Sequence, residues 1–468
     1  MRRIAIVGGG ISGLAAAFAL EQERNRGAQI SYVIFESTDR FGGVLRSERV
    51  NGCLVEAGPD SFLTEKPWAA DLCRELGFGN ELIGSNDAER KTYILINDRL
   101  VEIPDGLMFM VPTRLMPVFL SPLFSWSTKV QILREWFYRP TRTDSDVTVA
   151  EFVERHYGRE MVERVADPLL AGVYGGSADE LSVNSVLPRF VTMEASHGSL
   201  GKGMLAARKR HASGAPLFTS LRNGMQQLVD ALVARLPPAS RKLNTPVEQV
   251  KPESGKWLIV AEGRTQEFDS VIMATSAYVA AKFLESSSEI ATELAGIAYS
   301  SSATVVLACD QKVRGRLPAG FGFLIPRSEN RRMIAATFVH NKFPFRTPAD
   351  VALIRCFLGG TRDPAILQSS EDEIQGIVRR ELEQILGIRA EPLFTRIYKW
   401  KSAMAQYNVG HSSRITRIRD RVSSMPGLAL AGNAYGGIGV PDCVRSGSEA
   451  VAKILADLAI SVQARSAD

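Results

Sequence analysis

Apolar and polar positions divide the N-terminal part of the chain into a strand, a helix and a second strand. Residues 4–7 are apolar without alternation, which is typical of a parallel strand that is covered on both faces. The apolar positions from about residue 12 to residue 20 predict a helix, and the run over residues 31–35 predicts the next strand. This order of elements predicts an α/β fold with a parallel sheet.

The same patterns recur later in the chain. Helical periodicity predicts helices over residues 224–236 and 371–386. Apolar or alternating runs predict strands over residues 245–250, 257–260, 270–275, 304–308, 322–325, 333–339 and 353–358, the later ones in a mixed sheet with one face available to a ligand. The strands between 245 and 275 either form an independent β domain or complete the first domain after an insertion, and we favour the second interpretation.

The C-terminal segment repeats the order of the N-terminal one. A strand over residues 428–433 leads into a glycine-rich turn over 436–442, and a helix over 446–458 follows. We therefore expect two glycine-rich backbone sites, one from each end of the chain, for one long cofactor.

The first of these sites has the spacing GxGxxG, formed by Gly8, Gly10 and Gly13. Such glycines are often only structural, but this spacing also lets a pyrophosphate approach the backbone and lets the helix pack on the strand. The N-terminal amide groups of the helix then face the phosphates. Glu36 follows the second strand, close to the position at which a carboxylate hydrogen-bonds an adenosine ribose. The segment therefore predicts binding of an ADP-containing cofactor.

Two compact turns follow this segment. Arg40 precedes the paired glycines Gly42 and Gly43. Paired glycines can simply form a hairpin turn, but here they can let the backbone pass along an extended dinucleotide, with Arg40 near its phosphates. Residues 57–62 form the second turn, whose glycine and proline can bring main chain against a flat ring.

Length and composition indicate a folded protein of about two or three domains, because 468 residues exceed what one core usually supports. The net charge is only +5, and the chain shows no long basic run and no zinc-binding spacing, so we expect neither nucleic acid nor metal as a ligand. The five cysteines form no CxxC pair, which favours a reducing cytosol over a disulfide framework. We expect a cytoplasmic protein.

Residues 107–138 combine aromatic and basic side chains. Prolines and Arg114 interrupt the apolar run over residues 107–126, whereas a membrane-spanning helix needs about twenty uninterrupted apolar residues. The mixture suits a surface that lies on anionic lipid, on the inner face of a plasma membrane. It equally suits the core of a helical subdomain, and both interpretations stay open.

The motifs together resemble a known family. Residues 8–13, Glu36, and residues 40–43, 431–432 and 436–439 look like those of the flavin-containing amine oxidase and phytoene desaturase superfamily. Within it, other segments are similar to the oxygen-dependent porphyrinogen oxidases: residues 56–62, 170–175, 320–326, 406–407, 410–411, 440–443 and 446–447. Two positions depart from the pattern, since Asn433 stands where a small residue or aspartate is usual and Ala405 stands where proline is expected.

The resemblance implies three domains. A Rossmann-like FAD-binding domain would be assembled from residues 1–85, 200–280 and 415–468. A mixed-sheet substrate-binding domain would comprise residues 86–106 and 281–414, and a helical, membrane-associating or purely structural domain would comprise residues 107–199.

The resemblance also implies how FAD binds, which is without a covalent link, although Cys443 makes such a link conceivable. It assigns the pyrophosphate to glycines and neighbours of the first turn, and the adenosine ribose to Glu36. It assigns the adenine to the backbone of Val247, and the edge of the isoalloxazine ring to residues around Gly58. The cofactor-binding residues are then Gly8, Gly10, Ile11, Ser12, Gly13, Glu36, Arg40, Gly42, Gly43, Val44, Gly58, Val247, Trp400, Gly432, Ile438 and Val440.

The implied reaction is the six-electron oxidation of a porphyrinogen to the porphyrin in heme biosynthesis. In each of three rounds a hydride passes from a meso carbon to the flavin, and O₂ is reduced to H₂O₂. The resemblance places Lys66 at a propionate, Gly172 and Gly175 against the macrocycle, and Leu324 and Phe357 on its faces. Lys66 equally fits a solvated residue at a helix start, and Phe357 an ordinary core residue. We expect no essential His, Asp or Glu base.

Several alternatives stay open. The sequence does not choose between protoporphyrinogen IX and coproporphyrinogen III, because both carry propionates. A flavin amine oxidase or a carotenoid-type desaturase is the nearest enzymatic alternative, and a flavin-binding membrane adaptor is the non-enzymatic one. The family makes a homodimer plausible.

Overall fold

The computed structural model of the chain describes residues 1–139, 145–210, 215–285, 288–389 and 391–459. Within these residues, strands from both ends of the chain and from its middle form one parallel sheet of five strands, here called the parallel sheet. Its order is β12 (Arg241–Lys242), β2 (Ile30–Phe35), β1 (Arg2–Val7), β16 (Ser270–Met273) and β22 (Leu428–Leu430). Of the strands predicted between residues 245 and 275, the last therefore returns to the first sheet as β16, and β22 pairs with it. The strands predicted over 245–250 and 257–260 do not join this sheet.

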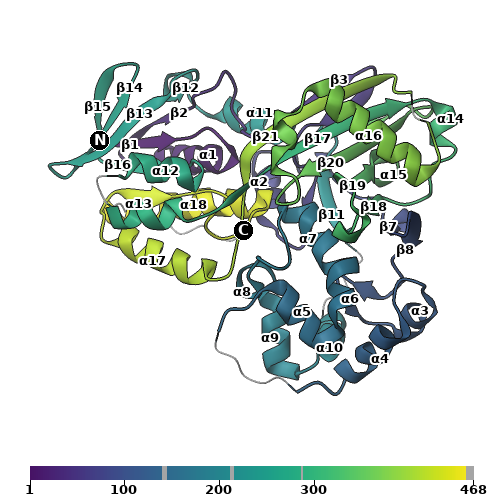
Figure 1. Ribbon diagram of the computed structural model, residues 1–468. Helices are drawn as coiled ribbons and strands as arrows, with labels where there is room; N and C mark the ends of the chain where they lie inside the picture. The colour runs from purple at the N-terminus through teal and green to yellow at the C-terminus, as the bar shows by residue number, and fades with distance from the viewer. Residues whose placement is uncertain (140–144, 211–214, 286–287, 390, 460–468) are drawn as a thin grey trace.

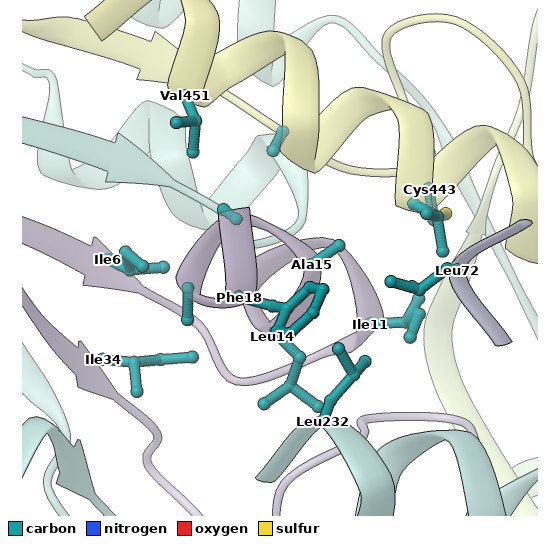
Figure 2. Close-up of a cluster of buried hydrophobic side chains, with 14 of the residues drawn as sticks. Ile6, Ile11, Leu14, Ala15, Phe18, Ile34, Leu72, Leu232, Cys443 and Val451 are labelled. Carbon is teal, nitrogen blue, oxygen red and sulfur yellow. The ribbon is translucent and has the colours of Figure 1, made fainter. Parts of the chain in front are cut away.

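Helices cover one face of the parallel sheet. They are α1 (Ile11–Asn25), α2 (Trp68–Glu75), α11 (Gln226–Arg235) and α18 (Val440–Asp457). Figure 2 shows Leu14 and Phe18 of α1 among side chains of the sheet, of α11 and of α18. Leu14 is fully buried, and such burial stabilises the fold by about 1.5–3 kcal/mol per side chain.

The other face carries a second set of elements. An antiparallel sheet of β13 (Val247–Glu253), β14 (Lys256–Ala261) and β15 (Arg264–Phe268) packs there through Trp257 and Phe268. The helices α12 (Ala277–Phe283), α13 (Ser288–Ala295) and α17 (His411–Ser423) complete this layer.

The last helix corrects one prediction. The glycine-rich turn was expected to extend to residue 442 and the helix to begin at 446, but α18 begins at Val440. Pro441 is well placed in the first turn because the amide groups there have no partner within the helix, so its missing N–H costs nothing. The glycine-rich segment therefore leads directly into the helix N-terminus.

A mixed sheet forms beside the parallel sheet (Figure 1). Among the described residues it has seven strands, in the order β21 (Phe394–Ala405), β17 (Tyr299–Cys309), β20 (Ala352–Gly359), β19 (Met333–Phe338), β18 (Gly322–Leu324), β7 (Thr92–Ile96) and β8 (Arg99–Glu102). The pair β18–β7 is parallel and the other pairs are antiparallel. The helix α16 (Glu371–Leu386) covers one face of this mixed sheet. On the opposite face Val306, Ala308 and Leu353 pack against Cys53 and Val55, whereas Leu324 and Phe357 stay partly exposed.

Helices α3 to α10 form a lobe below the two sheets in Figure 1. Their bounds are α3 (Leu115–Leu120), α4 (Trp126–Glu135), α5 (Val149–Tyr157), α6 (Arg159–Met161), α7 (Asp167–Tyr174), α8 (Val183–Val186), α9 (Pro188–His197) and α10 (Leu200–Arg210). Residues 107–138 contribute to the lobe core and also to its surface, since Phe124 and Ile132 are buried while Trp126 and Phe137 are 72% and 84% exposed. None of the helices in the described ranges combines the length and apolar character that a bilayer crossing requires.

Short strands complete the fold. They form the pairs β3 (Ser47–Val50) with β4 (Cys53–Glu56) and β9 (Leu107–Met108) with β10 (Val111–Pro112), and the group β5 (Phe62–Leu63), β11 (Phe218–Leu221) and β6 (Leu82–Gly84). Of these, β4 matters most for the site because the turn at Gly58 follows it directly.

Candidate functional site

The turn between β1 and α1 is tightly packed except at Gly10. A Cβ atom on Gly8 would lie 2.5 Å from the carbonyl oxygen of Ala274, and one on Gly13 would lie 2.0 Å from the carbonyl oxygen of Gly8. A Cβ atom on Gly10 would meet no atom within 4 Å among the described residues, and none of their side chains caps α1 there. The amide groups at the start of α1 therefore face open space that suits a phosphate.

The paired glycines pack against this turn. The N–H of Gly42 donates to the carbonyl oxygen of Gly9 at 2.8 Å, and a Cβ atom on Gly43 would meet the Cα atom of Gly10 at 3.4 Å. Arg40 donates to the carbonyl oxygens of Gly43, at 2.6 Å, and of Leu45. Its guanidinium group therefore shapes this loop.

Glu36 lies at the end of β2, beside the segment that leads to Val247. Its Oε2 atom accepts from the N–H of Gly9 at 2.8 Å, and its Oε1 atom accepts from the N–H of Thr38 at 2.9 Å. The N–H of Thr245 donates to the carbonyl oxygen of Glu36 at 2.9 Å. The structure thus brings Glu36 and the start of β13 to the same end of the parallel sheet.

The second glycine-rich segment is held by Tyr407. Its hydroxyl group donates to the carbonyl oxygen of Asn433 at 2.7 Å and accepts from the N–H of Gly437 at 2.8 Å. Burial raises the pKa of Tyr407 far above its ordinary value, so the hydroxyl group keeps its proton. The side chain of Asn433 donates to the carbonyl oxygen of Ala403 at 2.9 Å and thereby also anchors the loop between Gly432 and α18.

The two glycine-rich segments meet because α1 and α18 pack closely. A Cβ atom on Gly447 would lie 2.3 Å from the carbonyl oxygen of Ser12. Val440, the first residue of α18, is buried, and Ile438 before it is half-buried. Cys443 points into the core toward Ile11 and Leu72 (Figure 2).

The turn after β4 is fixed by side chains of the mixed sheet. A Cβ atom on Gly58 would lie 2.0 Å from the carbonyl oxygen of Val44. The indole N–H of Trp400 donates to the carbonyl oxygen of Ala57 at 3.0 Å, and Arg355 donates to that of Gly58 at 2.5 Å. Side chains of the mixed sheet therefore hold the turn at Gly58 beside the face of that sheet opposite α16.

Four predicted substrate residues surround that face. Leu324 and Phe357 lie in the same row of the mixed sheet, with β19 between their strands. Phe357 is half-buried, whereas the residues on either side of it are fully buried on the face covered by α16, so its ring lies on the opposite face. A Cβ atom on Gly172 would meet Leu324 at 3.5 Å, and one on Gly175 would meet Gly360, just after β20, at 3.4 Å.

Lys66 pairs with a carboxylate at the start of α18. Its Nζ atom lies 2.6 Å from Oδ2 of Asp442, whose side chain is only 3% exposed. The Lys66 side chain itself is 35% exposed and lies just before the start of α2, so it is partly solvated as well as paired. Burial, and to a lesser extent the Asp442 carboxylate, raise the pKa of Tyr174 above its ordinary value.

A buried group of five charged side chains was not predicted. Asp60 lies 3.1 Å from Lys342 and 3.3 Å from Arg355, and Glu56 lies 3.3 Å from Arg346. Burial alone would raise the pKa of Asp60, but the three cations outweigh burial and hold this pKa well below its usual range. These five residues come from segments that lie far apart in the chain. The one local signal in the sequence is the pair of cations Lys342 and Arg346 within an aromatic segment.

Comparison with known proteins agrees with this geometry. Residues 11–455 match the family described as flavin containing amine oxidoreductase. A coproporphyrinogen III oxidase of Bacillus subtilis (strain 168) is 32% identical over 97% of this chain and 98% of its own length. Protoporphyrinogen oxidase 2, chloroplastic/mitochondrial, of Arabidopsis thaliana is 29% identical over 98% of this chain and 94% of its own length.

A solved structure shows the same relationship. The protein from Exiguobacterium sp. 255-15, which bears the provisional name protoporphyrinogen oxidase, superposes with a TM-score of 0.87 at 29% identity, covering 98% of this chain and 99% of its own. The fold, the two glycine-rich helix starts and the match over nearly the whole length agree. The chain belongs to the flavin containing amine oxidoreductase family, whose cofactor is a flavin.

Proposed function

We propose that the protein is an oxygen-dependent oxidase that converts a porphyrinogen to the porphyrin in heme biosynthesis. The observation that carries this proposal is the arrangement of Gly172, Leu324 and Phe357 at the face of the mixed sheet opposite α16, next to the turn at Gly58. This arrangement offers a flat, largely apolar wall to a macrocycle. The relatives named above support the choice of substrate class, and coproporphyrinogen III is the first substrate to test.

The cofactor in this proposal is FAD, bound without a covalent link. The open space at Gly10 takes the pyrophosphate, Glu36 and the backbone of Val247 take the adenosine, and Val44, Gly58, Ile438 and Val440 border the ring. Burial raises the pKa of the Cys443 thiol to about 12, and the side chain points into the core (Figure 2). A protonated, inward-facing thiol is unsuited to attach a flavin.

When bound, the flavin supplies the acceptor for two electrons and O₂ takes them on to give H₂O₂, so three rounds remove six electrons. The chain itself binds and orients the substrate. Leu324 and Phe357 exclude water from the faces of the macrocycle, and Gly172 and Gly175 let it approach the backbone of α7. Lys66, held by Asp442, offers a cation to a propionate, and we propose no essential base.

A second part of the proposal concerns the exposed apolar side chains of α3, of α4 and of the residues just after α4, which would contact anionic lipid at the cytoplasmic face of a membrane. Met116, Leu120, Trp126 and Phe137 are 70%, 79%, 72% and 84% exposed. In a flotation assay the protein should rise together with anionic vesicles. A smaller fraction of a Trp126→Ser/Phe137→Ser variant should rise with them. Protein that stays entirely in the soluble fraction excludes this contact, and light scattering in the same buffer tests the proposed homodimer.

The enzymatic proposal is tested by aerobic turnover. Purified, flavin-loaded protein is incubated with coproporphyrinogen III, with protoporphyrinogen IX and with a panel of amines, and porphyrin fluorescence and H₂O₂ are recorded. We expect fluorescence with at least one porphyrinogen and H₂O₂ in a ratio of three to each porphyrin. Turnover of an amine without porphyrin formation from either porphyrinogen would instead establish an amine oxidase.

A further inference from the structure

Arg355 connects the substrate face of the mixed sheet with the turn at Gly58. It lies on β20 two residues before Phe357, and its guanidinium carbon is 5.2 Å from the centre of that ring. One terminal nitrogen donates to the carbonyl oxygen of Gly58 at 2.5 Å, and the other lies 3.3 Å from Oδ2 of Asp60. The side chain is only 4% exposed, so it acts in a place from which water is largely excluded.

Arg355 belongs to a buried group with an excess of positive charge. Its other members are Glu56, Asp60, Lys342 and Arg346, with side chains between 0% and 12% exposed. Three cations face two carboxylates, which leaves one positive charge in excess when both carboxylates are ionised. Among the described residues, Nε of Arg355 and both Nε and a terminal nitrogen of Arg346 have no hydrogen-bond partner. These guanidinium nitrogens therefore keep hydrogen-bonding capacity that the described residues do not use.

Excess charge in a buried group acts over a longer range than charge at the surface, because the low local dielectric screens the buried charge little. A flavin ring gains negative charge when it accepts electrons, and nearby protein charges tune that equilibrium. The turn at Gly58 is where the ring lies in the proposed function, on which this step rests.

We propose that Arg355 is a positioning residue for the flavin. It fixes the carbonyl group of Gly58 beside the ring and, through the excess positive charge of its group, favours the reduced flavin. The mixed sheet, which binds the substrate, thereby also sets how readily the flavin accepts electrons from the substrate.

The experiment compares wild-type holoenzyme with Arg355→Gln. The ratio of reduced to oxidised flavin is measured from the absorbance of the bound flavin, without oxygen, at a potential fixed by a reference dye. We expect the ratio to fall about tenfold in the variant, which corresponds to about 30 mV for a two-electron couple. A ratio within twofold of wild type overturns the proposal. No porphyrinogen is used, so an error in the proposed substrate leaves this result intact, whereas protein that cannot be loaded with flavin defeats the proposed function itself.

Three further variants separate charge from structure. Arg355→Lys keeps the charge and should stay within threefold of wild type, so a shift as large as that of Arg355→Gln contradicts the proposal. Lys342→Gln removes a cation of the same group without touching Gly58, and it should lower the ratio at least threefold even if Arg355→Gln fails to fold. An unchanged ratio in Lys342→Gln counts against the proposal.

The matched control is Arg164→Gln. Like Arg355, Arg164 donates to a backbone carbonyl, that of Leu123, and pairs with a carboxylate, Glu160, but it lies in the helical lobe. Its loss should leave the flavin ratio unchanged. An equal shift in this control would mean that any lost arginine perturbs the flavin and would overturn the assignment to Arg355.

Discussion

The parallel sheet and the mixed sheet face the site with different groups. At the parallel sheet the contacts are main chain, in turns where Gly8 and Gly13 leave no room for a side chain and Gly10 leaves space for a ligand. At the mixed sheet they are side chains, namely Leu324, Phe357 and Arg355. The difference teaches that substitutions of glycines at the first sheet add atoms either where none fit or where the cofactor would lie, whereas substitutions at the second sheet alter the shape and charge of a wall. The first should abolish cofactor binding, and the second should change the reaction by degrees.

Gly13→Ala should have the largest effect. Its Cβ atom would lie 2.0 Å from the carbonyl oxygen of Gly8, and overpacking of this kind typically costs about 1–3 kcal/mol. We expect the variant to purify without flavin and to unfold at lower urea concentration than wild-type apoprotein. A Gly13→Ala protein that is yellow with bound flavin and as stable as wild type would contradict the claim that this turn has no room for a side chain.

Gly10→Ala separates the ligand from the fold. Its Cβ atom meets no described atom within 4 Å, so the apoprotein should unfold at the same urea concentration as wild type. The added methyl group would occupy the space that we propose for the pyrophosphate, and flavin affinity should fall about a hundredfold, equivalent to about 2.8 kcal/mol. Titration of apoprotein with FAD measures this, and unchanged affinity would remove the pyrophosphate from this turn.

Gly172→Val tests the substrate face at the mixed sheet. A Cβ atom there makes an ordinary contact with Leu324 at 3.5 Å, but the larger side chain narrows the space above the wall. We expect kcat/KM for the porphyrinogen to fall about tenfold, or about 1.4 kcal/mol of transition-state stabilisation, while flavin content stays at the wild-type level. Gly172→Ala is the control and should stay within threefold of wild type. Loss of flavin from Gly172→Val would show that a change at the substrate face also disturbs cofactor binding.

Tyr407→Phe should have the smallest effect. Removing the hydroxyl group leaves the N–H of Gly437 and the carbonyl oxygen of Asn433 without this partner, and an unsatisfied buried group costs about 1–3 kcal/mol. Urea unfolding of the holoenzyme should show a loss in that range, with flavin still bound. A variant as stable as wild type would mean that Tyr407 does not anchor the second glycine-rich segment.

The same contrast explains what the sequence can predict. The turn at Gly8 to Gly13 is a local pattern, so its strand, its helix and the acid at Glu36 follow from spacing alone. The start of α18 was placed too late because a proline within a glycine-rich stretch was interpreted as part of a turn, although proline also suits the first helical turn.

Side-chain sites depend on pairing between distant strands. β21 was not predicted because this edge strand carries charges at Arg396, Lys399 and Lys401 and is half-exposed along most of its length. The partnership of Lys66 with Asp442 joins residues 376 positions apart, and no periodicity indicates it. The resemblance to a family, rather than the pattern of residues, pointed to Leu324 and Phe357.

The central claim is that one flavin, held by backbone from both ends of the chain, faces a porphyrinogen bound on the mixed sheet. Anaerobic mixing of the flavin-loaded protein with one equivalent of coproporphyrinogen III or protoporphyrinogen IX tests it most directly. We predict that the absorbance of oxidised flavin disappears with at least one of them and returns when oxygen is admitted. Flavin that stays oxidised with both porphyrinogens, yet is bleached by dithionite, would contradict the account.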